Sequence, residues 1–249
     1  MCVQYLNKSK PPLRMNPKNV GVVNRLYTRY KDGQEDDSIE RFFSTEVESL
    51  YAPIAKRISD EKGEFVLTNE DFFVLVKFVV CQIVRTKAHL RCIEEQAGTA
   101  LNTEVFIHNM ARKMSRIVDR WIAKPPHASI YTPATRDSHF ITGDNPVFSV
   151  TETRNYTGSD APSDVLAIVK IDQILEDPNS EFTVPLSPFV CLTIRNDGAG
   201  LITPYAQPRP PAWVSTVNQR VYRQCVQFVE AMHERTLGFH VRRNTPALP

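Results

Sequence analysis

The two halves of the chain differ in how apolar and polar positions alternate. In the first half, apolar residues recur at helical spacing over residues 39–59, 71–98 and 103–123, which predicts three helices. Pro53 lies inside the first of these ranges and is expected to kink the helix or to split it in two. Residues 68–71, Thr-Asn-Glu-Asp, supply a capping hydroxyl and two acids at the start of the second helix.

The second half consists of short runs with strand character, separated by turns rich in Pro, Gly and Asn. Asn196-Asp197-Gly198 predicts a hairpin between the strand before it and residues 200–203. A proline-rich connector is predicted over 205–211, a last helix over 212–235 and a final strand over 239–242. The other predicted strands are residues 128–132, 139–142, 147–150, 165–171, 182–185 and 189–195.

The order of helices, then strands, then a helix predicts an α+β fold. In this fold a helical layer, formed by three N-terminal helices and a C-terminal helix, packs on an antiparallel sheet. No linker divides the chain and no repeat recurs at a regular period, so we expect a single domain over residues 1–249. Its expected parts are an extended arm (1–36), a helical part (37–124), a mainly β part (128–204) and the C-terminal helix (212–235).

Composition narrows the function classes. The chain is 42% hydrophobic and 23% charged, which is typical of a globular protein with a core. A net charge of +2, from 30 basic and 28 acidic residues, argues against a general polyanion binder but leaves a local basic patch open. The cysteines form no CxxC pair, and no apolar run is long enough to cross a bilayer. We therefore expect buried free thiols, no membrane partner and a cytoplasmic location.

A polar stripe on the second predicted helix is the first candidate site. The surrounding residues are apolar on nearly every side, which is typical of a buried helix. Burying an amide and a guanidinium costs free energy unless both groups find partners. The stripe therefore either ties the core together or lines a pocket. Its members are Gln82, Arg85, Thr86 and His89.

Two interpretations of this stripe remain open. In the functional one, Arg85 and Arg91 hold a phosphate or carboxylate with their planar donor forks, and His89 transfers a proton. In the structural one, Arg85 pairs with a buried acid such as Glu48, and Gln82 bonds to the backbone.

The second candidate site is the turn Asp144-Asn145-Pro146, which follows a predicted strand that ends at Gly143. An acid just beyond a strand end is well placed for metal binding or proton transfer, because the sheet holds the backbone beneath it. Equally, Asp and Asn before Pro are common turn formers, and Asp144 would then only cap local amides. Helical zinc spacings and glycine-rich nucleotide loops do not occur in the sequence.

Six segments occur in a fixed order along the chain: Asp37-Ser-Ile-Glu40, Val47-Glu-Ser49, Cys81-Gln-Ile-Val-Arg-Thr86 with Arg91, Phe140-Ile-Thr-Gly-Asp-Asn-Pro146, Pro185-Leu-Ser-Pro188 and Asn218. Together they resemble a known family, the uncharacterised domain of unknown function 4238. The resemblance spans about residues 20–230 and implies a shared fold, but no reaction. It also implies that Gln82, Arg85 and Asp144 belong to one site. The chain differs from the family at its start, where no histidine follows the initiator.

These observations favour a phosphodiesterase or nuclease-like hydrolase, with nucleic acid or a nucleotide as its partner. Guanidinium, amide and carboxylate groups together suit phosphoryl chemistry. The alternatives are a non-catalytic module that binds a small anionic ligand or a partner protein, and a purely structural polar core. Whether the protein is an enzyme therefore stays open. The expected catalytic residues are Gln82, Arg85, Asp144 and Asn145. The expected ligand-binding residues are Arg91, Thr86, His89 and Asn218. The expected Mg²⁺ ligands are Glu48 and Asp144.

Overall fold

The computed structural model describes residues 2–5, 13–14, 29–31, 34–61, 64–84, 123–151, 177–225 and 228–231, and the positions 109, 112, 115–116 and 119–121. Its helices are α1 (Ser38–Phe43), η2 (Ser44–Glu48), α2 (Ser49–Glu61), α3 (Asn69–Val84) and α8 (Pro211–Gln224). Its strands are β1 (Cys2–Tyr5), β2 (Leu13–Arg14), β3 (Arg29–Lys31), β4 (Gln34–Asp36), β5 (His127–Pro133), β6 (Thr142–Gly143), β7 (Phe148–Thr151), β8 (Ser180–Ser187), β9 (Val190–Arg195), β10 (Ile202–Arg209) and β11 (Phe228–Ala231).

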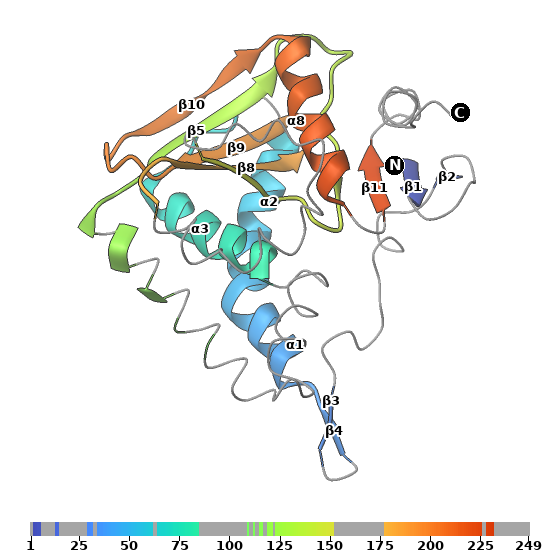
Figure 1. Ribbon diagram of the computed structural model, residues 1–249, viewed down its shortest axis with the longest axis vertical. Coiled ribbons are helices and arrows are strands. Elements are labelled where there is room, and N and C mark those ends of the chain that lie inside the picture. Colours follow the sequence, from blue (N-terminus) through green and yellow to red (C-terminus); the bar gives the residue numbers. More distant parts are fainter. Residues whose placement is uncertain are drawn as a thin grey trace.

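The first predicted helix is confirmed as a continuous rod formed by α1, η2 and α2 (Figure 1). Its buried residues are spaced so that they lie along one face, which is the amphipathic pattern read from the sequence. Within η2 the hydrogen bonding widens, and the N–H of Ser49 donates to the carbonyl of Ser44, five residues earlier. Pro53 follows within α2. The buried residues are Phe43, Val47, Ile54 and Ile58.

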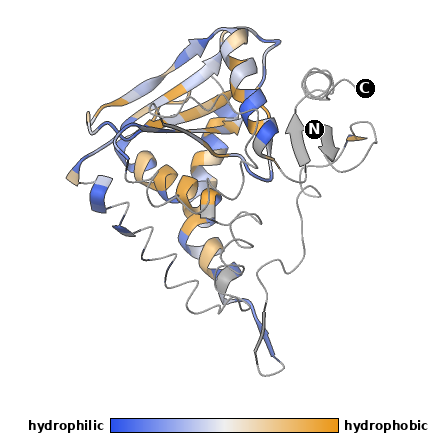
Figure 2. Ribbon diagram, in the orientation of Figure 1, coloured by the Kyte–Doolittle hydropathy of each residue, from blue (hydrophilic) through white to orange (hydrophobic). Residues whose placement is uncertain are grey.

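Helix α3 begins where the sequence predicted. The Thr68 hydroxyl accepts a hydrogen bond from the Asp71 N–H at 3.1 Å, and the Asp71 carboxylate accepts one from the Thr68 N–H at 3.1 Å. This reciprocal capping satisfies two donors at the helix start. The helix is apolar over most of its length (Figure 2). The predicted continuation beyond Val84 lies outside the described residues, as does most of the helix predicted over 103–123. The described positions from 109 to 121 are helical, and Trp121 is buried.

The main sheet has five strands in the order β10-β5-β9-β8-β7. The pairs β5–β9, β9–β8 and β8–β7 are antiparallel, whereas β10 is parallel to β5. The predicted purely antiparallel sheet is therefore wrong in this one pair, and the fold is α+β with a mixed sheet.

The predicted hairpin between β9 and β10 is also wrong, because β5 lies between these two strands. The connecting turn crosses the end of β5 instead. Gly198 and Gly200 have φ values of +66° and +64°, a region that glycine adopts readily. The Gly200 N–H donates to the Pro125 carbonyl at 2.9 Å, which holds the crossing against the chain that leads into β5.

Residues 205–211, predicted as a proline-rich connector, instead contribute most of β10. This strand lies at the edge of the sheet. A proline has no N–H to donate, and it is tolerated in an edge strand because one side of that strand has no neighbour to bond with. The register of β10 with β5 shifts between Thr203, which pairs with Ser129, and Gln207, which pairs with Tyr131. The residues between these two pairs form a bulge.

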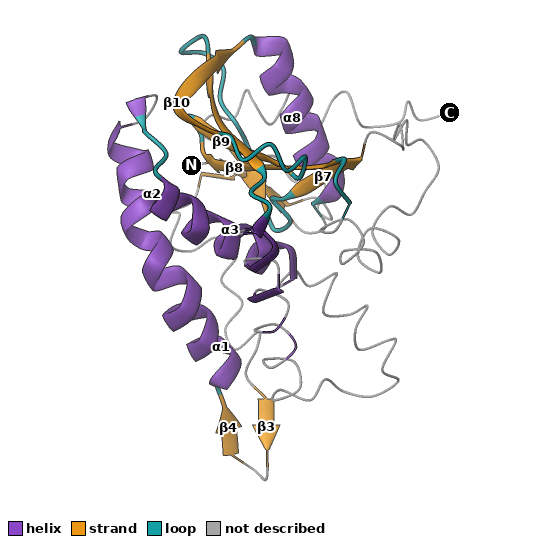
Figure 3. Ribbon diagram, turned by 90° about the vertical axis from the view of Figure 1, so that its left-hand side faces the viewer, coloured by secondary structure: helices purple, strands orange, loops and turns teal. Residues whose placement is uncertain are grey.

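The two faces of the sheet are covered by different helices. Ile130, Leu192 and Val184 belong to a buried cluster that also contains residues of α2 and α3. Tyr131 and Cys191 instead pack with the buried face of α8. Seen from the side, α2 and α3 lie on one side of the strands and α8 on the other (Figure 3). The sheet is therefore the middle layer of three.

A second sheet joins distant parts of the chain in the order β2-β1-β11-β6. Its strand β11 corrects the predicted last helix over 212–235, because α8 ends at Gln224. The Phe-Val-Glu-Ala sequence of β11 pairs with β1 on one side and β6 on the other, so long-range pairing overrides local helical spacing. Of the strand predicted over 139–142, only the end is β structure, in β6. The strands predicted over 165–171 and 239–242 lie outside the described residues.

Candidate functional site

The candidate site is the turn that contains Asp144 and Asn145, between β6 and β7. The chain that leads into this turn is buried and is held by one side chain of α8. The Asn218 side-chain N–H donates to the carbonyl of His139 at 2.8 Å, and its carbonyl accepts from the N–H of Ile141 at 3.0 Å. Asn218 is 2% exposed, so both bonds lie inside the protein. Asn218 therefore clamps the backbone three residues before Asp144.

The Pro185-Leu-Ser-Pro188 corner holds the same segment from another side. The N–H of Phe140 donates to the carbonyl of Pro188 at 3.0 Å. The His139 ring meets the ring of Phe189 edge to face at 5.3 Å between centroids. The Ser187 hydroxyl accepts a hydrogen bond from the Phe189 N–H at 3.1 Å, so it contributes to the local structure of the corner.

Cys225, the residue after α8, contacts the turn itself. Its Sγ donates to the carbonyl of Asn145 at 3.8 Å, and the carboxylate of Asp144 lies beside the thiol. Burial raises the pKa of the Cys225 thiol, and the negative charge of Asp144 acts in the same direction. The thiol therefore stays protonated at neutral pH and acts as a hydrogen-bond donor that ties the turn to α8.

A cation lies on the same helix close to the turn. The guanidinium carbon of Arg220 stands 5.6 Å from the centre of the Phe148 ring, at the start of β7. Arg220 is exposed, as expected for a residue on the outer face of α8. The sequence analysis missed this residue, because its place depends on how α8 lies against β7.

The structure brings together three of the predicted site residues, namely Asp144, Asn145 and Asn218. Asp144 and Asn145 are partly exposed, whereas Asn218 is buried and hydrogen-bonds to the backbone of His139 and Ile141. Gln82 lies partly buried in the last turn of α3, and Glu48 is exposed on η2. The grouping of Gln82 with Asp144 stays a prediction. The remaining predicted residues, Arg85, Thr86, His89 and Arg91, lie outside the described residues.

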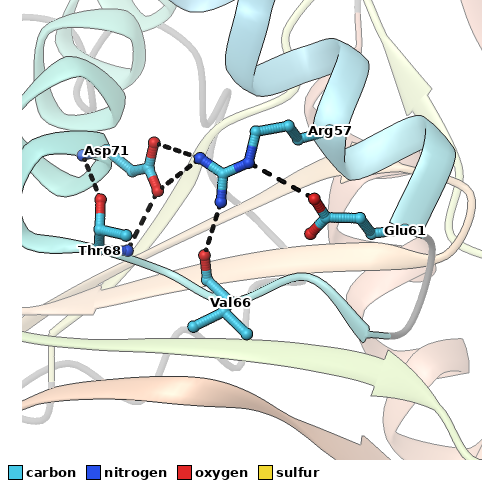
Figure 4. Close-up of polar contacts among 5 residues, drawn as sticks. All are labelled: Arg57, Glu61, Val66, Thr68 and Asp71. Carbon is cyan, nitrogen blue, oxygen red and sulfur yellow. Dashed lines mark hydrogen bonds and ion pairs between the residues drawn. The ribbon is translucent and has the colours of Figure 1, made fainter.

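The structure also shows an arginine network that the sequence analysis missed (Figure 4). Arg57 of α2 donates to both carboxylate oxygens of Asp71, at 2.9 and 3.0 Å, and to the carbonyl of Val66 at 3.0 Å. It also forms an ion pair with Glu61 at 3.5 Å. Asp71 is 7% exposed and also caps α3. The network joins α2 to the start of α3, so its role is structural. The cap was readable in the sequence, but its arginine partner was not.

Two further properties concern the part of the chain that the structure describes. No group of three or more His, Cys, Asp or Glu side chains within it gathers in a way that could hold a metal ion. No helix there has the length and apolar character needed to span a bilayer. The predicted pairing of Glu48 and Asp144 on Mg²⁺ stays a prediction.

Comparison with known proteins gives one match. A family model described as "Protein of unknown function (DUF4238)" matches residues 1–124 and 127–234, nearly the whole chain. The resemblance read from the sequence motifs is thereby confirmed. Neither the curated proteins nor the solved structures give a match. The segments that meet around Asp144 belong to motifs that carried the resemblance.

Proposed function

The chain belongs to the DUF4238 family, whose function is unknown, and on this premise we propose that it is a hydrolase of phosphodiesters. The substrate class would be a nucleotide or a nucleic acid. The turn at Asp144 and Asn145 would form the centre of the site. Gln82, which lies in the last turn of α3, and Arg85 would complete it.

One observation supports this proposal above the others, namely the clamp by Asn218. A buried amide uses both its donor and its acceptor to hold the backbone of residues 139 and 141. The acid and the amide that follow are thereby presented, partly exposed, on a rigid base. Catalytic groups need support of this kind, because small displacements cost large factors in rate.

The proposed chemistry is attack of water on phosphorus. The Asp144 carboxylate takes a proton from the water, whose oxygen forms the new bond to phosphorus. Asn145 orients this water, and the Arg85 guanidinium holds the phosphoryl oxygens that gain charge. The bond to the leaving oxygen breaks, and His89 supplies the proton that this oxygen takes up. The products are a phosphomonoester and an alcohol.

The test is turnover of bis-(p-nitrophenyl) phosphate and of short single-stranded DNA and RNA, with Mg²⁺ and with EDTA. Asp144→Asn removes the base but keeps the shape and the turn-forming character of the side chain. We expect its kcat to fall by at least about 100-fold, the usual contribution of a general base.

Asp197→Asn is the matched control. Asp197 is an exposed turn aspartate whose carboxylate accepts a hydrogen bond from the Ala199 N–H. This variant should keep the wild-type kcat. Wild-type protein that turns over none of these substrates, or an Asp144→Asn variant as active as wild type, would contradict the proposal.

One observation favours a second candidate, a module that binds an anionic ligand without turning it over. The Asp144 carboxylate lies against the Cys225 thiol, so the carboxylate uses part of its hydrogen-bonding capacity within the protein rather than on a substrate. Arg220 would then supply the positive charge for the ligand. Saturable binding of a nucleotide with no turnover, weakened by Arg220→Gln, would support this candidate over the hydrolase.

A further inference from the structure

A second cation lies at the other end of α8, where β10 passes into the helix (Figure 1). The guanidinium carbon of Arg209 is 4.2 Å from the ring centre of Tyr131 and 5.6 Å from that of Trp213. The two rings are themselves 5.0 Å apart between centroids. Contacts of this kind hold the plane of a guanidinium and lower the entropy that it loses on binding.

Arg209 has no anionic partner in the described part of the chain, unlike the three arginines that form ion pairs there. Arg57 pairs with Asp71, Arg195 with Glu181, and Arg41 with Asp37. Arg209 forms no ion pair there, and its Nε is buried without a hydrogen-bond acceptor. An unsatisfied buried donor costs about 1–3 kcal/mol, and more when the group is charged. A bound ion or an ordered water is one known partner of such groups in native proteins.

The first turn of α8, which begins two residues after Arg209, contains a backbone donor without a partner among the described residues. Pro210 is the N-cap and offers no side-chain cap, and Pro211 has no N–H. The N–H groups of Trp213 and Val214 both donate to the carbonyl of Pro210. Among the described residues, none accepts the N–H of Ala212. An open N–H at the positive end of a helix dipole attracts an anion.

We propose that Arg209 and the first turn of α8 form a binding site for a phosphate group. The planar fork of the guanidinium matches two phosphate oxygens, and the open amide of Ala212 would take a third from another direction. Trp213 and Tyr131 act as positioning residues, because they hold the guanidinium. Inorganic phosphate, a nucleotide and a nucleic-acid backbone all present this group.

This site is separate from the proposed hydrolase centre and does not depend on it. Helix α8 has 14 residues, so its two ends are about 20 Å apart at 1.5 Å per residue. Arg209 stands before one end, and Cys225, which contacts the turn at Asp144, stands after the other. Loss of the phosphate site would therefore leave the Asp144 chemistry testable by itself.

The protein carries its own reporter for the test. The chain has two tryptophans, and Trp121 is 1% exposed, whereas Trp213 contacts Arg209. Tryptophan emission is titrated with inorganic phosphate, ADP and a short single-stranded oligonucleotide, against sodium chloride of equal ionic strength. We expect a saturable change with phosphate that sodium chloride does not reproduce. The oligonucleotide and ADP titrations identify which source of phosphate binds most tightly.

Arg209→Gln should raise the Kd for phosphate at least tenfold. Arg223→Gln, which removes an exposed arginine from the far end of the same helix, should leave it unchanged. Arg209→Lys keeps the positive charge but not the fork, so it should fold and bind several-fold more weakly. The proposal is overturned if wild-type protein shows no saturable response, or if either Arg209 variant, confirmed as folded by circular dichroism, binds phosphate as wild type does.

Discussion

Replacement of Asn218 by alanine tests whether one buried amide holds the candidate site in place. The substitution removes the donor to the His139 carbonyl and the acceptor for the Ile141 N–H. Both backbone groups belong to buried residues, and Asn218 itself is 2% exposed. Both bonds are therefore shielded from solvent, and their backbone partners lose them when the amide is removed.

The expected loss follows from the two backbone groups left without partners. Each unsatisfied buried group costs about 1–3 kcal/mol, so the free energy of unfolding should fall by about 2–6 kcal/mol. This is a large part of the 5–15 kcal/mol that is typical of a whole domain. Asn218→Asp separates the two bonds, because a carboxylate still accepts from the Ile141 N–H but cannot donate to the His139 carbonyl.

The assay is unfolding in urea followed by tryptophan fluorescence, with amide hydrogen exchange of the peptide that contains Ile141. We expect a lower midpoint at an unchanged m-value, and faster exchange at Ile141. The matched control is Asn69→Ala, at the exposed first residue of α3, which should change stability by less than about 0.5 kcal/mol. An Asn218→Ala variant as stable as this control would refute the assignment of Asn218 as a clamp.

Two further predictions concern the helical layer. Asp71→Ala removes the capping acid and the partner of Arg57, so it should lower the unfolding free energy by about 2–4 kcal/mol in chemical denaturation. Thr68→Ala removes only the capping hydroxyl and should lower it by about 1 kcal/mol. Equal losses for the two variants would contradict the role of Arg57. Burial raises the pKa of Tyr51 from 10.0 to about 12, so as the pH rises from 10 towards 12 the unfolded state loses this proton and the folded state keeps it. Stability should therefore fall over that range, by up to about 3 kcal/mol relative to Tyr51→Phe, and parallel pH profiles of urea midpoints for the two proteins would contradict the assignment.

The sequence predicted those elements whose signal is local. The apolar spacing of Phe43, Val47 and Ile54 gave the first helix, and Thr68 with Asp71 gave the start of α3. Strands β5, β8 and β9 also lie where strand-type residues gather between turns. Each of these signals comes from residues within one helical turn or one strand, so no knowledge of the rest of the chain was needed.

The failures share a cause, which is pairing between segments far apart in the sequence. The Asn196-Asp197-Gly198 signal is a true turn, but it cannot reveal that β5 lies between the strands it joins. The prolines of β10 argued against a strand, and only the position of β10 at the sheet edge allows them. Likewise, β11 exists because β1 and β6 pair with it.

The candidate site shows the same limit. Asp144 and Asn145 were readable as a turn beyond a strand, but the role of Asn218 depends on an atom 77 residues away, the Ile141 N–H. Arg57 and Arg209 were missed for a related reason. The partner of the first and the aromatic contacts of the second come from other elements, β5 among them for Arg209. Side-chain type alone does not tell an ion-paired arginine from an unpaired one.

The clamp at Asn218 also bears on why a polar group is buried there at all. An apolar residue of similar size would fill the space between α8 and residues 139–141, and replacement of buried polar groups by apolar ones is often neutral for stability. An apolar residue makes no directional bond, however, so it could not fix the position of residues 139–141 along α8. The amide fixes this position at both His139 and Ile141, and the chain runs only three residues further to Asp144. The position of the carboxylate relative to Cys225 and Arg220 thus depends on Asn218. This dependence links a buried residue of α8 to the chemistry proposed for the turn.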